Sequence, residues 1–313
     1  MNGLELSRAY YEAYGKPMLE TRFPALLPHL AVGLFGAGSE CFGFDDEISR
    51  DHDFEPGFCI LLPDEDTVDR RSEFLLERAY AKLPKTFDGM SRQALAPVGG
   101  ARHGVMRTAE FFEKAVGSPD GALTARQWLT LPEQALAEAT NGAIFFDGRG
   151  EVTRIRDALA YFPEDVRLKR LAGQLLLMGQ AGQYNYPRCL AHGERAAAQL
   201  AVCEYVKSAV SAVFLLNRRY QPYYKWSFRA LRELPLLSSF AQPLEWLLTT
   251  PNDGETAAQK AACIERLAAE VIVELRLQGL SGADGADLER HAYVVNDRIG
   301  DAAIRTLHIL AAV

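Results

Sequence analysis

Two short motifs in the first sixth of the chain carry groups that could bind a metal-bound phosphate. The first is the pair Gly38-Ser39, which follows an apolar run at 30–35. The second is a pair of carboxylates, Asp51 and Asp53, separated by one residue. Side chains alternate between the faces of a strand, so in a strand both aspartates would point the same way. Two carboxylates on one face, beside the N–H groups of a glycine turn, suit a triphosphate that carries Mg²⁺.

A plainer interpretation of the same residues stays open. Gly38-Ser39 could cap a short helix that begins at Glu40, because serine is a good N-cap residue. Asp51 and Asp53 could simply solvate the end of a strand. The order strand, glycine turn, short helix and second strand favours the metal–triphosphate site over this alternative.

The elements that must position these motifs alternate between strands and helices. Short apolar runs bounded by glycine, proline or aspartate predict strands at 31–35, 51–62, 103–108 and 143–146. The helices expected among them lie at 4–14, 17–29 and 66–83.

The second half of the chain has a different pattern. From about residue 163 the sequence is almost entirely helical, with long segments expected at 196–217, 256–278 and 286–311. This change predicts two domains, 1–162 and 163–313. The expected fold class is α+β: a mixed sheet flanked by helices, followed by an all-α helical bundle.

Gly38-Ser39 together with Asp51-His52-Asp53 resembles the signature of nucleotidyltransferases with the DNA polymerase β-type fold, over roughly residues 20–150. The resemblance implies a nucleotidyltransferase-like sheet and a Gly38-Ser39 turn that contacts the triphosphate. It implies that Asp51 and Asp53 are catalytic and hold Mg²⁺ or Mn²⁺, and that a later strand supplies a third carboxylate. Metal ions would clamp the reacting oxygens, which is most of what nucleotidyl transfer requires.

More closely, the whole chain resembles a bacterial family of unknown function, domain of unknown function 4037. The phrases that carry this resemblance lie at 43–53, 142–147 and 219–226. It implies a nucleotidyltransferase domain followed by a helical C-terminal domain, and it does not identify a substrate.

The third carboxylate is where the sequence departs from the superfamily pattern. The strand expected at 103–108 carries Arg107 where an acid is expected. Glu110 is the nearest acidic candidate for a catalytic role as metal ligand or base. Asp147 ends a later strand, but an aspartate in a turn before glycine is more often structural.

A basic and aromatic stretch in the helical half could also bind nucleotide. Residues 218–226 contain two arginines, one lysine and four aromatics. Lys225 could meet the triphosphate while a tyrosine stacks on a base or an acceptor. The alternative is a corner between helices, with aromatics in the core and basic groups on the rim. The family resemblance favours Lys225 as a nucleotide-binding residue.

Composition limits the partners and the compartment. The net charge of −7 disfavours a long nucleic acid as partner, since phosphate neutralisation needs clustered Lys and Arg. The five cysteines are scattered and predict reduced thiols. The N-terminal sequence predicts no signal peptide, and no apolar run reaches the roughly 20 residues that span a bilayer. We therefore expect a cytoplasmic protein that does not associate with membranes.

Two functions from different classes follow. The first is a metal-dependent nucleotidyltransferase that moves a nucleoside monophosphate from an NTP, with ATP favoured, to a hydroxyl of a small molecule or protein. The second is a nucleotide-binding or antitoxin-like module that keeps the fold and has reduced or no catalysis. The sequence leaves the acceptor and the oligomeric state open.

Overall fold

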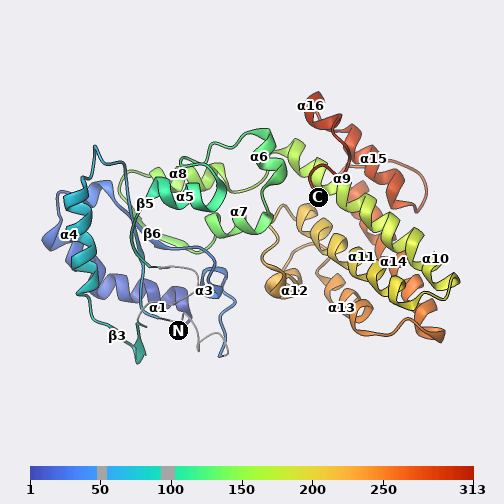
Figure 1. Ribbon diagram of the computed structural model, residues 1–313, viewed down its shortest axis with the longest axis horizontal. Helices are drawn as coiled ribbons and strands as arrows, with labels where there is room; N and C mark the ends of the chain where they lie inside the picture. Colours follow the sequence, from blue (N-terminus) through green and yellow to red (C-terminus); the bar gives the residue numbers. More distant parts are fainter. Residues whose placement is uncertain (48–54, 93–102) are drawn as a thin grey trace. The chain divides into compact units, whose positions relative to one another are not determined.

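The computed structural model describes residues 1–47, 55–92 and 103–313, which form two compact units (Figure 1). Unit 1 comprises 1–123 and 134–160, and unit 2 comprises 124–133 and 161–313. The short segment 124–133 thus interrupts unit 1 in sequence while it packs with unit 2. The fold class is α+β, because unit 1 holds the strands and the described part of unit 2 is helical.

Unit 1 is built on a mixed four-stranded sheet. Its strands are β1 (Ala31–Leu34), β2 (Cys59–Leu62), β5 (Gly104–Arg107) and β6 (Ala143–Asp147), in the order β5-β2-β1-β6. β1 runs antiparallel to both β2 and β6, whereas β2 and β5 are parallel. The short strands β3 (Thr86–Phe87) and β4 (Met90–Ser91) form a separate hairpin.

These strand directions bring four chain segments to one end of the sheet. Gly33 in β1 pairs with Cys59, the first residue of β2, and Cys59 pairs with Gly104, the first residue of β5. Leu34 pairs with Ala143, the first residue of β6. We call this the site end: the C-terminal end of β1 and the N-terminal ends of β2, β5 and β6.

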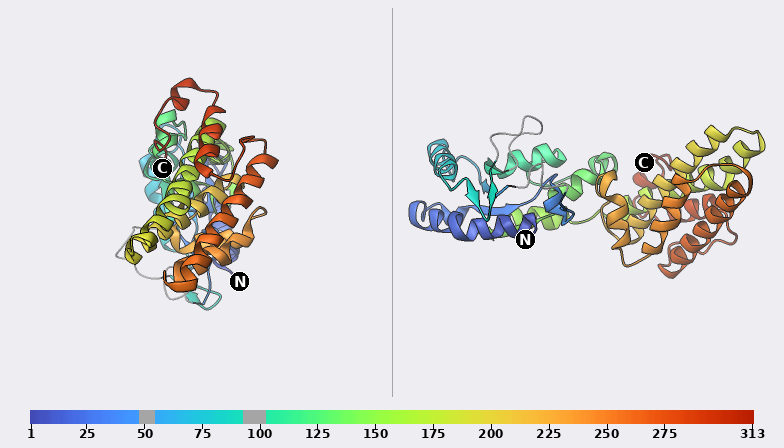
Figure 2. Two further views of the ribbon diagram at one scale, coloured as in Figure 1. Left: turned by 90° about the vertical axis from the view of Figure 1, so that its right-hand side faces the viewer. Right: turned by 90° about the horizontal axis from the view of Figure 1, so that it is seen from below.

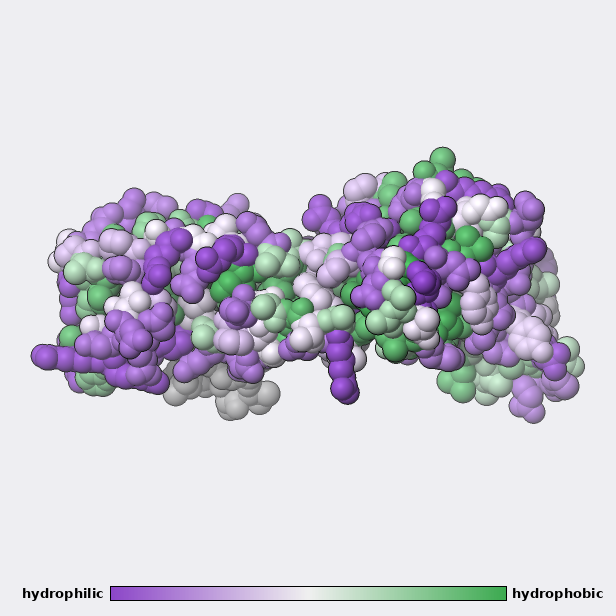
Figure 3. Space-filling model, turned by 90° about the horizontal axis from the view of Figure 1, so that it is seen from above, coloured by the Kyte–Doolittle hydropathy of each residue, from purple (hydrophilic) through white to green (hydrophobic). Residues whose placement is uncertain are grey.

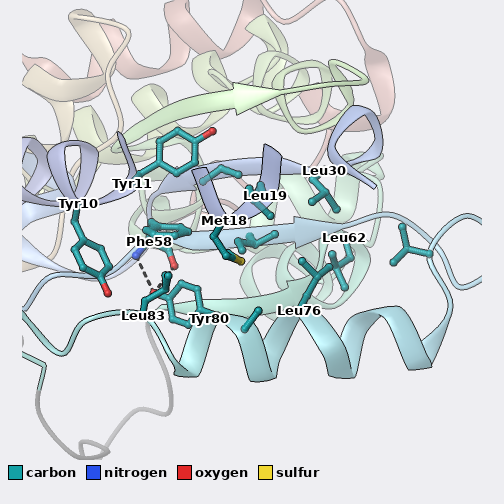
Figure 4. Close-up of a cluster of buried hydrophobic side chains, with 14 residues drawn as sticks. Tyr10, Tyr11, Met18, Leu19, Leu30, Phe58, Leu62, Leu76, Tyr80 and Leu83 are labelled. Atoms are coloured by element: carbon teal, nitrogen blue, oxygen red, sulfur yellow. Dashed lines mark hydrogen bonds between the residues drawn. The ribbon is translucent and has the colours of Figure 1, made fainter. Parts of the chain in front are cut away.

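One face of the sheet is covered by N-terminal helices and by α4 (Arg70–Ala81). The N-terminal helices are α1 (Gly3–Tyr10), the π-helical turn η1 (Tyr11–Gly15) and α2 (Lys16–Arg22). Their side chains form a core with alternate residues of the strands, among them Val32, Ile60 and Leu62 (Figure 4). The period of two in this set is what a strand with one face on this core requires.

Phe58 is the centre of this core, immediately before β2. Its ring packs on Gly15, where any Cβ would overlap the ring, so the π-helical turn depends on glycine. The Tyr80 hydroxyl accepts a hydrogen bond from the Phe58 N–H at 3.0 Å and donates one to the Phe58 carbonyl at 2.9 Å (Figure 4). Phe58 and Tyr80 together hold the start of β2 in place.

Helices also cover the other face. α5 (Thr108–Val116) packs on β5 and α8 (Glu151–Ala158) packs on β6. The right-hand view of Figure 2 shows α1 and α5 on opposite sides of the strands. β1 and β2 are therefore buried on both faces, which explains their continuous apolar sequences.

Unit 2 is a bundle around the helix α11 (Arg195–Leu216). α9 (Glu164–Met178), α10 (Tyr186–Ala191), α13 (Ala241–Thr249) and α14 (Gly254–Leu277) pack against it. By length and composition α11 could cross a membrane, and 67% of its apolar window is buried inside the protein. It is therefore the core helix of the bundle. On the face drawn in Figure 3, the surface of each unit is mainly hydrophilic.

Three expected elements differ from the observed ones. The helix expected at 17–29 ends at Arg22, and a separate 3-10 turn, η2 (Leu27–His29), follows it. The segment 286–311 holds two short helices, α15 (Leu288–Asp297) and α16 (Ala302–Arg305). The Asp165 carboxylate accepts hydrogen bonds from the N–H groups of Gly300 and Asp301, at 3.0 and 2.8 Å, so these groups cannot continue a helix. The strand expected at 51–62 is also shorter than expected. Residues 55–58 are not in a strand, and β2 begins at Cys59, after the acidic motif that contains Asp51 and Asp53.

All five cysteines lie in the described part of the chain and are thiols, as expected from their spacing. Burial raises the pKa of the Cys59 thiol to about 12, so this residue is a small apolar core side chain.

Arg107, which stands where the superfamily pattern implies an acid, is a buried clamp at the other end of the sheet. Its guanidinium donates to the Glu73 carboxylate at 2.5 and 3.1 Å. It also donates to the carbonyls of Pro63 and Val68, at 2.7 and 2.8 Å. Arg107 thereby ties β5 to α4 and to the loop that follows β2.

Substituting Arg107→Met should lower the free energy of unfolding by about 3–5 kcal/mol, because it leaves Glu73 and two carbonyls buried without their donor. Chemical denaturation followed by circular dichroism measures this. Arg107→Lys keeps the positive charge and loses the forked geometry of the guanidinium. Its free energy of unfolding should therefore lie between those of Arg107→Met and wild type. A loss below about 1 kcal/mol for Arg107→Met would show that the clamp is not structural.

Candidate functional site

The Gly38-Ser39 turn lies at the site end, directly after β1. It is held to the start of β6 by Asn141, whose Oδ1 accepts from the Gly36 N–H at 2.9 Å and whose Nδ2 donates to the Gly36 carbonyl at 2.7 Å. The Gly142 N–H donates to the Cys41 carbonyl at 2.8 Å. The turn is thus fixed on both sides of Gly38-Ser39 by the neighbouring strand.

The short helix α3 (Ser39–Phe42) begins one residue earlier than the capping interpretation requires. Gly38 is the N-cap residue, and no side chain caps this helix. The expectation that Ser39 is the N-cap is therefore wrong. Ser39 is the first residue of the helix, and it is half-buried. The buried Glu40 carboxylate lies so close to Gly38 that any Cβ there would overlap it. A side chain at 38 would therefore displace the Glu40 carboxylate.

Two further side chains meet at the site end, and the sequence analysis missed both. Glu55 precedes β2, and His103 precedes β5. Because β2 and β5 are parallel, the two residues enter the sheet side by side, and His103 Nδ1 lies 3.3 Å from Glu55 Oε1. Their side chains are 8% exposed for His103 and 20% for Glu55, so the pair is partly shielded from water. The available signal was the spacing of acids at 51, 53 and 55.

The two predicted metal ligands, Asp51 and Asp53, lie outside the described residues, as does His52. Within the described ranges, no group of three or more His, Cys, Asp or Glu side chains could hold a metal ion. A metal at the site end would therefore depend on Asp51 and Asp53.

Glu110 is not brought together with the Gly38-Ser39 turn. It is exposed in the first turn of α5, beyond the C-terminal end of β5. Four residues of strand, about 10 Å, separate the two ends of β5, and Gly38-Ser39 lies at the opposite end. Asp147 also lies at that far end, where its carboxylate accepts from the Thr153 N–H and hydroxyl, both at 2.8 Å. Its role is structural, as its turn position indicates.

Lys225 lies in unit 2, exposed in the first turn of α12 (Tyr224–Arg232). Its Nζ is 5.1 Å from the ring centre of Trp226. The neighbouring Tyr223 and Tyr224 are 39% and 73% exposed. Tyr220, by contrast, packs against Phe162, with ring centres 4.9 Å apart. The stretch 218–226 is thus a corner whose first aromatic packs inward and whose Tyr223, Tyr224 and Lys225 are exposed. Its last aromatic, Trp226, is half-buried.

A half-buried acid, Glu133, holds this corner in place. Glu133 Oε2 accepts a hydrogen bond from the backbone N–H of Gln221 at 3.0 Å, and its Oε1 lies 3.5 Å from the Ser211 hydroxyl. Desolvation raises the pKa of Glu133, and the positive charge of Arg170 acts against this. The loop before Lys225 therefore depends on one carboxylate from the segment 124–133.

Arg170 anchors the same segment to unit 2. Its Nη2 donates to the carbonyls of Trp128, Leu129 and Leu131, at 3.1, 3.1 and 2.6 Å. Its guanidinium lies 4.6 Å from the ring centre of Phe162. These contacts explain why residues 124–133 pack with unit 2 although they lie between two parts of unit 1.

Residues 128–227, about a third of the chain, match the model of a family described as a domain of unknown function (DUF4037). The match confirms the resemblance to that family over this stretch. It contains Glu133, Arg170 and Lys225, and so covers both the half-buried acid and the corner that the acid holds. No curated protein and no solved structure shows a significant match.

The close approach of Glu40 to Gly38 can be tested with a double-mutant cycle. Gly38→Ala should lower the free energy of unfolding by about 1–3 kcal/mol, because the new Cβ displaces a buried carboxylate. In a protein that already carries Glu40→Ala, the change Gly38→Ala should cost much less. The difference between the two costs, which is the coupling free energy of the pair, should be about 1 kcal/mol or more. Denaturant titrations of the four proteins measure both quantities.

Gly282→Ala is the matched control, since no atom lies within 4 Å of a Cβ built there. Its effect should stay within about 0.5 kcal/mol. Equal costs of Gly38→Ala with and without Glu40 would contradict the contact.

The raised pKa of Glu133 predicts a pH-dependent stability. The folded state binds this proton more tightly than the unfolded chain, whose ordinary value is 4.5. The stabilisation of the folded state by this proton is therefore complete below pH 4.5, and it is lost as the pH rises through the folded-state pKa of Glu133. Glu133→Gln has no such proton, so the stability of wild type relative to this variant should fall between pH 4.5 and neutral pH. Urea titrations of both proteins across this range measure it, and a constant difference would refute the prediction.

Proposed function

We propose that this protein is a metal-dependent nucleotidyltransferase. It would transfer a nucleoside monophosphate from an NTP, with ATP favoured, to a hydroxyl group of a small molecule or a protein. The observation that carries the proposal is the strand pairing at the site end. The glycine turn after β1 and the chain that enters β2 from the acidic motif meet at the same end of one sheet.

Chain geometry limits how far the predicted metal ligands can lie from this end. Asp53 is two residues before Glu55, and two residues span at most about 7 Å. Asp51 is four residues before Glu55, so the corresponding limit is about 14 Å. Within these limits, we propose that both carboxylates lie at the site end with the Glu55–His103 pair.

In the proposed site the metal ligands are oxygen atoms, which suit Mg²⁺ or Mn²⁺. Asp51 and Asp53 would hold the metal, and Glu55 takes the place of Glu110 as the third carboxylate. The metal supplies electrostatic stabilisation of the phosphate oxygens. His103 positions the Glu55 carboxylate through the 3.3 Å contact between Nδ1 and Oε1.

The remaining groups would bind the nucleotide. The Ser39 hydroxyl can donate a hydrogen bond to a phosphate oxygen, and the backbone near Gly38 offers further N–H groups. Lys225 stays a proposed nucleotide-binding residue, supported by its positive charge and its exposure in the first turn of α12. Acyl or thiol chemistry is not needed, since positioning and charge stabilisation suffice for nucleotidyl transfer.

One observation favours the second function, a nucleotide-binding or antitoxin-like module without efficient transfer. Arg107 occupies the position of the expected acid and is committed to Glu73, so β5 supplies no carboxylate. The choice between the two functions then depends on whether Glu55 completes the metal site.

Incubation of the protein with Mg²⁺ and each labelled NTP should release pyrophosphate and label an acceptor or the protein itself. The double substitution of Asp51→Asn with Asp53→Asn should abolish turnover and metal-dependent nucleotide binding, because it removes the metal ligands. Nucleotide-induced thermal stabilisation without pyrophosphate release would support the binding module instead. Wild-type affinity for Mg·NTP in the double variant would refute the site.

Glu55→Gln and Glu110→Gln form a matched pair for the third carboxylate. Glu55→Gln should lower the rate of pyrophosphate release by a factor of about 100 or more, since an essential group is removed. Glu110→Gln should keep the wild-type rate, because Glu110 lies at the opposite end of β5. The reverse result would restore Glu110 as the catalytic acid residue.

A further inference from the structure

Unit 2 contains a cavity that the proposed nucleotidyl transfer does not use. One side of the cavity is lined by α14. The other side is lined by α13 and by the short helix η5 (Ser238–Phe240) that precedes it. Its volume is about 500 Å³. Cavities of roughly 300–1,000 Å³ are typical of small-molecule sites, so the space is sufficient for a ligand of nucleoside size.

The apolar lining of the cavity offers a flat aromatic surface. Phe240 and Leu267 are 0% and 1% exposed and contribute buried apolar atoms to it. Trp246 is half-buried and borders the same space. A partly exposed indole beside a cavity can stack on a planar ring, and such stacking is favourable for any base or heteroaromatic ligand.

The polar lining combines donors with acceptors. Arg266 and Glu270 are four residues apart on α14, so their side chains emerge about 5–6 Å apart on one side of the helix. Arg266 also donates to Cys263 Sγ at 3.7 Å, which keeps the guanidinium beside the cavity. Gln242 adds an amide from α13, with both a donor and an acceptor.

The charges of Arg266 and Glu270 cancel, so this cavity attracts neutral ligands more than a triphosphate. The edge of a nucleobase matches the arrangement, because it places an N–H donor beside a ring-nitrogen or carbonyl acceptor. A purine is favoured over a pyrimidine because its two fused rings offer more area to stack on Trp246. We infer that this cavity binds a purine nucleoside, with the base stacked on Trp246 and its polar edge facing Glu270 and Arg266. The inference is independent of the proposed transfer, since none of these residues belongs to that site.

Isothermal titration of the full-length protein with adenosine, guanosine, cytidine and uridine, without divalent metal, tests the inference. Purine nucleosides should bind saturably, and the pyrimidines should bind at least tenfold more weakly. Trp246→Leu should weaken purine binding at least tenfold, while Trp246→Phe should retain more of it because a ring remains. The double variant Arg266→Met with Glu270→Gln should also lose at least tenfold.

The matched control is the exposed pair Glu204 and Lys207 on α11, whose charged atoms are 3.6 Å apart. The double variant Glu204→Gln with Lys207→Met should bind purine nucleosides as wild type does. Circular dichroism and thermal melting check that every variant is folded. Absence of saturable purine binding at millimolar concentration, equal binding of pyrimidines, or unchanged binding in folded Trp246→Leu would each overturn the inference.

Discussion

The antiparallel pairing of β1 with both of its neighbours is the constraint on which the candidate site depends. It places the end of β1 beside the beginnings of β2 and β6, and the parallel pair β2–β5 adds the beginning of β5. Phe58 and Tyr80 secure this arrangement, because their hydrogen bonds and packing hold the start of β2 against the helices. The residues directly after β5 and β6, Glu110 among them, lie at the other end of the sheet.

Unit 2 depends on a different constraint, the solvation of buried charge. The charged groups of Arg170 and Glu133 are both shielded from water. Arg170 donates hydrogen bonds to backbone carbonyls of the segment 124–133, and Glu133 accepts one from the backbone N–H of Gln221. Removing either partner would leave polar groups buried without a hydrogen bond, which is costly. This need fastens 124–133 to unit 2 and fixes the loop that presents Lys225.

The same two constraints separate structural from functional roles among the charged residues. Arg107 has four hydrogen bonds to α4 and to the loop after β2, which accounts for a cation where the superfamily pattern implies an acid. Glu55 and His103 contact each other and lie at the site end, where the proposed third carboxylate is needed. In the proposed site, a carboxylate that stands in for the expected third acid must therefore enter from the same end of the sheet.

The sequence by itself determined the α+β class, the strands β1, β5 and β6 to within about two residues, and the helical second half. It could do so because these depend on local apolar periodicity. It also identified Gly38-Ser39 and the acidic motif as candidate chemistry. Only the tertiary structure decided that Glu55 and His103 meet at one end of the sheet while Glu110 lies at the other, because strand direction is set by pairing between distant segments. The hydrogen bonds of Asp165 that divide 286–311, and those of Glu133 to the Lys225 loop, are equally invisible to local pattern, since their partners are far apart in the chain.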